Sequence, residues 1–243
     1  MNTSAGDSHT PVRVLIVVDS WQGHTARVAE RFAEGVAGAG ATPVTVAADA
    51  ATRANLLSAD ALVMGSAVHQ RGMTWKMKRF VDEVCEPAWF YDDLVGKVGA
   101  VFTAGGGAGS AGGGAEAAQL GMLTNLAALG MVLVTLPKDT PGSEHGGIHW
   151  GPTIRTTTSA MEPIAPGDLA PEAMVAYFHH GANVARVAGR LRGLTLAAGN
   201  QLPTPEVRAG RASAERGTAA NVRARHPADP ARAQIHDDTA LKD

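Results

Sequence analysis

Residues 12–36 read VRVLIVVDSWQGHTARVAERFAEGV, and this stretch decides the fold class. It begins with the largely β-branched apolar run 12–18, which is typical of a strand buried on both faces of a parallel sheet. A polar segment with one glycine follows at 19–24. From Thr25 to Val36 the apolar residues recur every three or four positions, which predicts an amphipathic helix. The stretch is therefore the strand, loop and helix that begin a βαβ unit.

The same alternation continues along the chain. Strands are predicted at 12–18, 43–47, 60–65, 98–103 and 131–136, and helices at 25–36, 54–59, 73–85, 116–129 and 171–191. Pro171 stands in the first turn of the last helix, where proline is favoured. The segment 138–170 is rich in Gly, Pro and Thr and is predicted to be a long loop. Five strands alternating with helices indicate a doubly wound α/β fold, with its ligand crevice at the carboxyl ends of the strands.

The composition excludes several classes of protein. The chain has 243 residues, a formal net charge of −2 and one cysteine, Cys85, which we interpret as a packing residue. One cysteine excludes a disulfide framework and a cysteine-based metal site, and it fits a reducing cytoplasm. The weak net charge does not favour nucleic acid or an anionic membrane as a partner. No apolar run approaches the length of a membrane span, and residues 1–13 lack the apolar core of a secretory signal. We therefore predict a cytoplasmic protein with no metal site, no nucleic-acid partner and no membrane insertion.

The two ends of the chain differ from its middle. Residues 1–10 are small and polar and are predicted to be a flexible N-terminus, followed by one domain over 11–192. Residues 193–243 are rich in Ala, Arg and Pro and carry seven basic and six acidic side chains. This tail cannot bury enough apolar surface to offset its ordering entropy, so disorder is predicted. An arm that binds nucleic acid is the alternative, which the acidic residues disfavour.

Three chemically unusual loops follow the first, third and fourth strands. The first, at 20–25, places two hydroxyl groups and a glycine before a helix, which suits a phosphate monoester; an ordinary helix cap by Ser20 or Thr25 is the alternative. The second, at 66–73, could lay backbone amides along a flat heteroaromatic ring beside a positive charge, or could be a solvated loop. The third, at 104–114, has seven glycines in eleven residues. Such a loop allows backbone to approach a ligand closely, or it is a low-complexity insertion.

With these motifs, residues 12–192 resemble the flavodoxin-like superfamily, and most closely the WrbA-type NAD(P)H:quinone oxidoreductases and their NADPH-dependent FMN reductase relatives. The resemblance implies a five-stranded parallel sheet in the order 2-1-3-4-5 with helices on both faces. In that family Ser-x-x-Gly-His-(Ile/Thr) holds the FMN phosphate, which implies this role for Ser20, Trp21, Gln22, Gly23, His24 and Thr25. His24 would then act through its backbone rather than as a catalytic base.

The other two loops match the family in part. The family stretch Gly-Thr-Pro-Thr-Arg-Phe-Gly-Asn-Met corresponds to residues 65–73, which implies contact with the isoalloxazine ring by Val68, His69 and Gln70. The glycine-rich loop implies further cofactor contacts by Thr103, Ala104, Gly105, Gly106, Gly107 and Gly109. The chain departs from the family at Ala67 and Gln70, at Gln22 in the phosphate loop, at Ala128-Leu129, and in a third loop about four residues longer.

Outside the loops, the resemblance points to residues near the substrates. Trp89 precedes Lys97 by eight residues, as does a family tryptophan that sits over the flavin of a neighbouring subunit; an anchor in an oligomer interface is the alternative. The segment 146–151 matches a late family motif and implies a substrate contact by Trp150. Arg71 is a candidate for the charge that stabilises reduced flavin. His149, with His145, is a candidate proton donor to a reduced quinone.

The resemblance therefore predicts an enzyme that uses FMN. A hydride would pass from NADPH or NADH through FMN to a quinone or a related small aromatic acceptor, by a ping-pong mechanism in one shared pocket. A homodimer or homotetramer is implied by the role of Trp89 across a subunit boundary. Two alternatives remain: a flavodoxin-like electron carrier, and a flavin-free regulatory or structural descendant.

Overall fold

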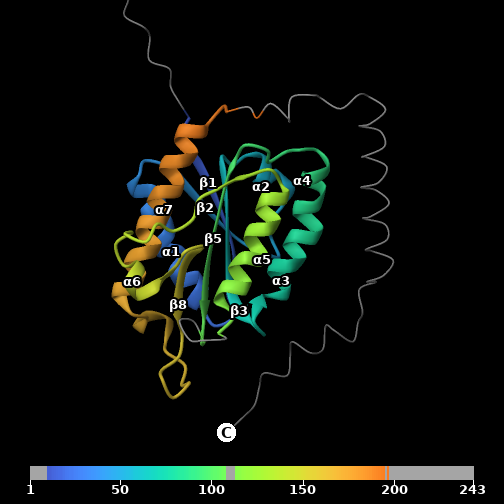
Figure 1. Ribbon diagram of the computed structural model, residues 1–243. Helices are drawn as coiled ribbons and strands as arrows, with labels where there is room; N and C mark the ends of the chain where they lie inside the picture. Colours follow the sequence, from blue (N-terminus) through green and yellow to red (C-terminus); the bar gives the residue numbers. More distant parts are fainter. Residues whose placement is uncertain (1–9, 108–112, 195, 197–243) are drawn as a thin grey trace, which may run out of the picture. The chain divides into compact units, whose positions relative to one another are not determined.

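The structure of the chain is a computed structural model that describes residues 10–107, 113–194 and 196 (Figure 1). The chain divides into a unit of residues 1–200 and a unit of residues 201–243, and the second lies wholly outside the described residues. The flexible N-terminus predicted at 1–10 and the tail predicted at 193–243 are therefore outside this description, apart from Thr10, Gly193, Leu194 and Leu196.

The predicted α/β fold is confirmed. The strands are β1 (Arg13–Asp19), β2 (Thr42–Ala47), β3 (Ala61–His69), β4 (Gly72–Met73), β5 (Val98–Gly105), β6 (Val132–Leu133), β7 (Gly147–Ile148) and β8 (Gly151–Arg155). The helices are α1 (His24–Gly38), α2 (Arg53–Leu57), α3 (Trp75–Phe80), α4 (Glu86–Phe90), α5 (Ala115–Ala128), α6 (Ser143–Gly146) and α7 (Pro171–Leu191). The main sheet runs β2-β1-β3-β5-β8, and all its neighbouring strands are parallel. This is the predicted order 2-1-3-4-5, with β8 in the fifth place.

Alternate residues of β1 feed two separate apolar cores, which explains why this strand reads as a continuous apolar run. Ile16 packs on the face covered by α1 and α7, together with Phe32 and Tyr177 (Figure 1). Leu15 packs on the opposite face, which α3 and α5 cover, together with Met122. Burial on both faces fixes the strand in the centre of the sheet.

The fifth strand differs from the sequence prediction of one strand at 131–136. Only β6 pairs with β5 there, at Val98 and Gly99, and β8 pairs with the end of β5, at residues 103–105. β8, β7 and α6 all lie in the stretch 138–170, which was predicted to be a loop. The physical reason is a close approach at Gly151, where a Cβ atom would lie 2.2 Å from the carbonyl oxygen of Val101. Only a glycine lets this later segment complete the sheet.

The helix predicted at 73–85 also differs. α3 begins at Trp75, continues through a π-helical turn at Val81–Cys85, and leads into α4, so the helical path reaches Phe90. Pro87 stands in the first turn of α4. Because proline has no backbone N–H to donate, it accounts for the change of hydrogen-bond pattern just before it.

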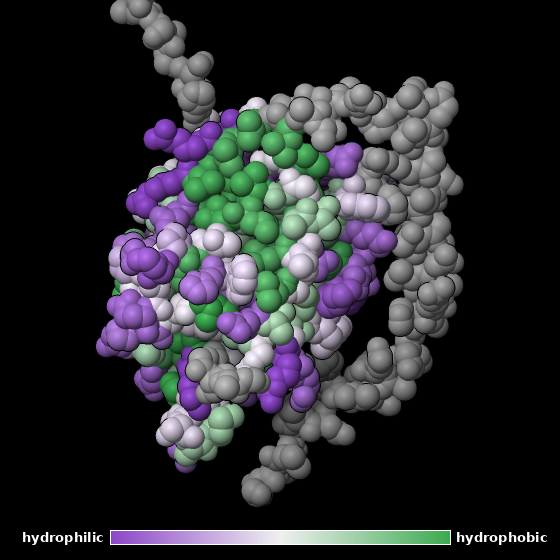
Figure 2. Space-filling view, in the orientation of Figure 1, coloured by the Kyte–Doolittle hydropathy of each residue, from purple (hydrophilic) through white to green (hydrophobic). Residues whose placement is uncertain are grey.

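One edge of the sheet is incompletely covered. Val132, Leu133 and Val134 are half-buried at this edge, where β6 pairs only with β5. Figure 2 shows apolar residues gathered on the upper part of this face, between α7 and α5. None of the helices in the described part of the chain is long and apolar enough to cross a membrane.

Candidate cofactor site

The three loops singled out in the sequence meet at the carboxyl ends of β1, β3 and β5, as doubly wound topology predicts. Together with one later segment they enclose a cavity of about 100 Å³. Its lining consists of Ser20, Trp21, Gln22, His24, Thr25, Ala67, Val68, His69, Ala104, Gly105, Gly106 and Thr156. No carboxylate stands among these residues. The lining therefore carries no negative charge, which suits an anionic ligand.

The first loop presents free backbone donors at the start of α1. Gly23 is the cap residue and has a φ of 88°, a conformation that favours glycine. The Ser20 hydroxyl accepts a hydrogen bond from the Ala26 amide at 3.1 Å, so the helix-capping alternative holds in part. Within the described chain, the amides of Gly23, His24 and Thr25 have no hydrogen-bond partner. Three unpaired N–H groups at a helix N-terminus are ready to bind an anion.

The ring of His24 is used to hold another segment in place. Its Nε2 atom donates a hydrogen bond to the carbonyl oxygen of Ile164 at 2.5 Å. Pro166 lies in the same later segment, and its side chain would be 3.2 Å from a Cβ atom on Gly23. This geometry leaves the His24 backbone, and not its ring, available to a ligand.

The second loop is a tight hairpin rather than an open loop. β3 extends to His69, turns at Gln70 and Arg71, and pairs with β4 through Val68 and Met73. His69 packs edge-on against the Trp21 ring, with 4.7 Å between the ring centres. Val68 and His69 line the cavity as expected, whereas Gln70 does not.

The third loop approaches the second very closely. A Cβ atom on Gly105 would lie 2.8 Å from the Cβ atom of Val68, so glycine is required there. Ala104 and Gly106 also line the cavity, but Gly107 does not. Gly109, the other predicted contact in this loop, lies outside the described residues.

The side chain of Thr103 faces away from the cavity, although a cofactor contact was predicted for it. The residue is fully buried, and its hydroxyl group lies 3.0 Å from the hydroxyl of Thr153 and accepts a hydrogen bond from Gln119. Its carbonyl oxygen accepts a hydrogen bond from the buried Tyr177 hydroxyl at 2.6 Å. Thr103 therefore anchors the base of the third loop to β8, α5 and α7.

A fourth segment at the cavity was missed by the sequence analysis. Thr156 lines it and donates its amide to the carbonyl oxygen of Gly105 at 3.2 Å. The hydroxyl group of Thr157 donates to the carbonyl oxygen of Gly106 at 2.8 Å. These threonines follow β8, so only the pairing of β8 with β5 brings them to the third loop. The Thr-Thr-Thr run at 156–158 was the only sequence signal available.

The remaining predicted residues are not among those that line this cavity. Trp89 is exposed in α4, at the far end of the helical path that leaves the site at Thr74. His149 and Trp150 form the exposed turn between β7 and β8, six or more residues before Thr156 along the chain. Arg71 is exposed at the hairpin tip and is not among the lining residues. In the described part of this one chain, none of these four side chains lines the pocket.

A buried acid lies just behind the first loop. Asp19 ends β1, and within the described residues one of its carboxylate oxygens has no hydrogen-bond partner. The pKa of Lys76 is raised mainly by its hydrogen bond to Asp49, and to a lesser extent by the charge of Asp19. Asp19 does not line the cavity.

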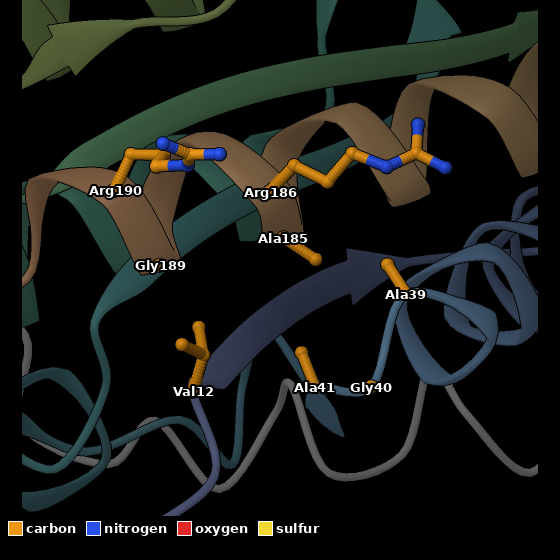
Figure 3. Close-up of a pocket in the computed structure, with 8 residues that line it drawn as sticks. All are labelled: Val12, Ala39, Gly40, Ala41, Ala185, Arg186, Gly189 and Arg190. Carbon is orange, nitrogen blue, oxygen red and sulfur yellow. The ribbon is translucent and has the colours of Figure 1, made fainter. Parts of the chain in front are cut away.

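A larger hollow, about 310 Å³, lies at the opposite end of the fold (Figure 3). Arg186, Gly189 and Arg190 line it from α7, and Val12 and Ala41 lie on its other side. This hollow borders the beginning of β1 and the end of α1, far from the loops at the carboxyl ends of the strands. Because ligands of doubly wound sheets bind at the carboxyl ends, the smaller cavity is the candidate site.

Comparison with known proteins agrees with this geometry. A family described as "Flavodoxin-like fold" matches residues 9–134. The chain is 36% identical over 122 residues to a "Flavodoxin" of Aquifex aeolicus, with 50% of this chain and 63% of that protein covered, which is less than two thirds of its length. It is 32% identical over 206 residues to an "NAD(P)H dehydrogenase (quinone)" of Paraburkholderia phymatum, with 74% and 99% covered. A protein of the same name from Azorhizobium caulinodans is 31% identical over the same length and coverage.

A solved structure extends the fold comparison. The flavodoxin, WrbA-like protein of Agrobacterium tumefaciens aligns with a TM-score of 0.57 at 23% identity, covering 74% of this chain and 99% of that one. At this level of identity the similarity concerns the fold.

Proposed function

This chain belongs to the flavodoxin-like family, and from that premise we propose that it is a flavin-dependent oxidoreductase that reduces quinones with NAD(P)H. The relatives named NAD(P)H dehydrogenase (quinone) align with almost their full length, which supports an enzyme over a structural protein. The observation that carries the proposal is the pocket at the end of β1, which has no carboxylate in its lining and three unpaired amides at the start of α1.

We propose FMN as the flavin. The residues present fit its phosphate, since the first loop supplies free N–H groups and a hydroxyl and the lining has no carboxylate. The cavity holds a phosphate group and not a whole nucleotide, so the hairpin residues Val68 and His69, with Trp21 and Gly106, are proposed to contact the rest of the cofactor. When bound, FMN would supply the redox chemistry: a hydride is taken from NAD(P)H, and two electrons and two protons reach the quinone, one proton coming from solvent.

The protein itself provides binding and orientation. Gly105 and Val68 hold the second and third loops together, and Thr156 and Thr157 fasten the third loop from its other side. Because one pocket would serve both substrates in turn, we propose a ping-pong order. No side chain of the lining needs to act as an acid or base for hydride transfer.

An oligomer is the second part of the proposal. All four tryptophans are exposed, with exposed fractions of 62% for Trp21, 56% for Trp75, 52% for Trp89 and 37% for Trp150. Large exposed aromatic groups support an interface between copies. Trp89, His149 and Trp150 could then meet the cofactor only in a neighbouring subunit. The cytoplasmic location stays a prediction.

Two Ser20 variants test the phosphate site directly. Ser20→Asp keeps an oxygen that can accept from the Ala26 amide but adds a negative charge. Binding of FMN, measured by quenching of flavin fluorescence, should weaken at least 30-fold, while binding of riboflavin, which has no phosphate, should change less than threefold. Ser20→Ala, which removes the hydroxyl without adding charge, is the matched control and should weaken FMN binding only a few-fold.

Anaerobic titration with NADPH and NADH tests the reaction. Absorbance of the bound flavin should be lost with either nucleotide and restored by a quinone. A protein that binds FMN but is reduced only by another redox protein would be an electron carrier, which the similarity to a flavodoxin keeps as the second candidate. Failure to bind any flavin would overturn both.

A further inference from the structure

The tip of the hairpin between β3 and β4 has an unusual backbone. Gln70 and Arg71 have φ values of 45° and 69°, so two consecutive residues with side chains occupy the left-handed region. A two-residue hairpin turn of this kind favours asparagine and glycine, because each larger residue is strained there. Strained backbone of this kind is concentrated at ligand sites.

The surroundings of the tip explain why it keeps this shape. A Cβ atom on Gly114, the cap residue of α5, would lie 2.5 Å from the Cα atom of Arg71. The hairpin backbone therefore rests directly on the start of α5. This contact holds the Arg71 side chain outside the packed core, where it is exposed.

The charge of Arg71 is not neutralised by the part of the protein that the structure describes. Across residues 10–107, 113–194 and 196, its guanidinium group makes no hydrogen bond and no ion pair. In contrast, Lys76 pairs with Asp49 at 2.8 Å, and Arg79 pairs with Glu83 at 2.8 Å. Two residues before Arg71, His69 lines the cavity. An unpaired cation thus stands in the hairpin that supplies Val68 and His69 to a pocket whose lining has no carboxylate.

We propose that Arg71 binds a phosphate group of the nicotinamide dinucleotide that reduces the enzyme. This inference rests on the proposed function, because a pyridine nucleotide must be the reductant. A guanidinium group makes two parallel hydrogen bonds to a phosphate, and an exposed, unpaired one can do so without breaking an existing ion pair. The first loop is reserved for the cofactor phosphate, so the second anionic ligand needs a separate cation.

Two phosphate sources have this chemistry. The pyrophosphate is common to NADH and NADPH, whereas the 2′-phosphate occurs in NADPH alone. Comparing the two nucleotides distinguishes these sources. Arg71 is a substrate-binding residue in either case.

The test uses the flavin-loaded full chain and the variants Arg71→Gln, Arg71→Gly and Arg186→Gln. Dissociation constants for NAD⁺ and NADP⁺ are measured by calorimetric titration, which needs no turnover, and those for NADH and NADPH by anaerobic rapid-mixing reduction. Arg71→Gln and Arg71→Gly should each weaken binding about tenfold, equivalent to about 1.4 kcal/mol. Arg186→Gln removes the same charge at the opposite hollow and should change binding less than twofold.

Arg71→Gly adds a second readout. It relieves the positive φ of 69° and should raise the melting temperature by about 2–4 °C, whereas Arg71→Gln keeps the strain and should not. A loss for both nucleotides assigns the pyrophosphate, and a loss for NADPH and NADP⁺ alone assigns the 2′-phosphate. Unchanged binding of all four nucleotides by Arg71→Gln would overturn the inference. If the unaltered protein is not reduced by NADH or NADPH, it is the proposed function that fails.

Discussion

Replacing Gly35 by alanine tests the close contact between α1 and α7. A Cβ atom at Gly35 would lie 1.9 Å from the carbonyl oxygen of Phe178 and 3.1 Å from the amide nitrogen of Ala182. Both atoms belong to the backbone of α7, so no side-chain rotation relieves the overlap. The two helices must separate by at least 1.1 Å to reach the 3.0 Å limit of real contacts (3.0 minus 1.9).

Two opposing effects set the size of the change. Alanine is favoured over glycine inside a helix by about 1 kcal/mol. Overpacking of a rigid core costs about 1–3 kcal/mol, and a clash between backbones belongs at the upper end of that range. We therefore expect Gly35→Ala to lower the free energy of unfolding by about 2 kcal/mol, because the steric cost exceeds the gain in propensity.

Gly38 supplies the matched control on the same helix. Its Cβ atom would lie 3.5 Å from the Phe178 ring, which is an ordinary contact. Gly38→Ala should therefore leave stability unchanged or raise it by about 0.5 kcal/mol, less than in a helix interior because Gly38 ends α1. Urea denaturation followed by circular dichroism measures both variants. Equal stability of Gly35→Ala and Gly38→Ala would show that the glycine contact does not limit how closely the helices pack.

Three further predictions concern buried polar groups. Tyr177→Phe removes the 2.6 Å hydrogen bond to the carbonyl oxygen of Thr103 and should lower the free energy of unfolding by about 1–2 kcal/mol, measured by urea denaturation. No loss of stability would mean that this hydrogen bond does not hold the third loop in place. Burial lowers the pKa of His180 from 6.5 to about 4, so on acidification the unfolded chain takes up this proton before the folded chain does. The free energy of unfolding should therefore fall, by up to about 3 kcal/mol, as the pH drops from 6.5 to 4. His180→Leu should flatten this pH dependence, and an unchanged curve would contradict the assignment. Burial raises the pKa of the Cys85 thiol, so in the native protein it should not react with a disulfide reagent at pH 8. It should react once the chain is unfolded in urea. A fast reaction of the native protein would show that the helix opens at Cys85.

Much of the fold could be predicted because its central elements are encoded locally. The run at 12–18 and the helical periodicity at 25–36 appear in the structure as β1 and α1, shifted by one or two residues. For the same reason, the first loop could be located: strand, glycine and helix follow one another within one short stretch. The order of the strands then followed from the resemblance and is confirmed by the pairing of β1 with β2 and β3.

The site could be predicted only as far as local motifs reach. Ser20, His69 and Gly105 line the cavity because each stands at or just after the carboxyl end of a strand, and these strands end at the same edge of the sheet. A cofactor contact was also predicted for Thr103, whose hydroxyl group is hydrogen-bonded to Thr153 and Gln119 instead of lining the cavity. Thr156 was missed because nothing near it in the sequence marks it as close to the third loop.

The sequence by itself determined the class of the fold and the position of the three loops. Hydrophobicity, periodicity and glycine content are local properties of the sequence, and each can be recognised within a window of some ten residues. The tertiary structure alone decided that β8 completes the sheet, that Thr156 reaches the pocket and that the backbone of Arg71 rests on the start of α5. Those outcomes depend on contacts between residues about 40 to 50 positions apart, such as Gly105 with Thr156 and Arg71 with Gly114, whose energies exist only once the chain is packed.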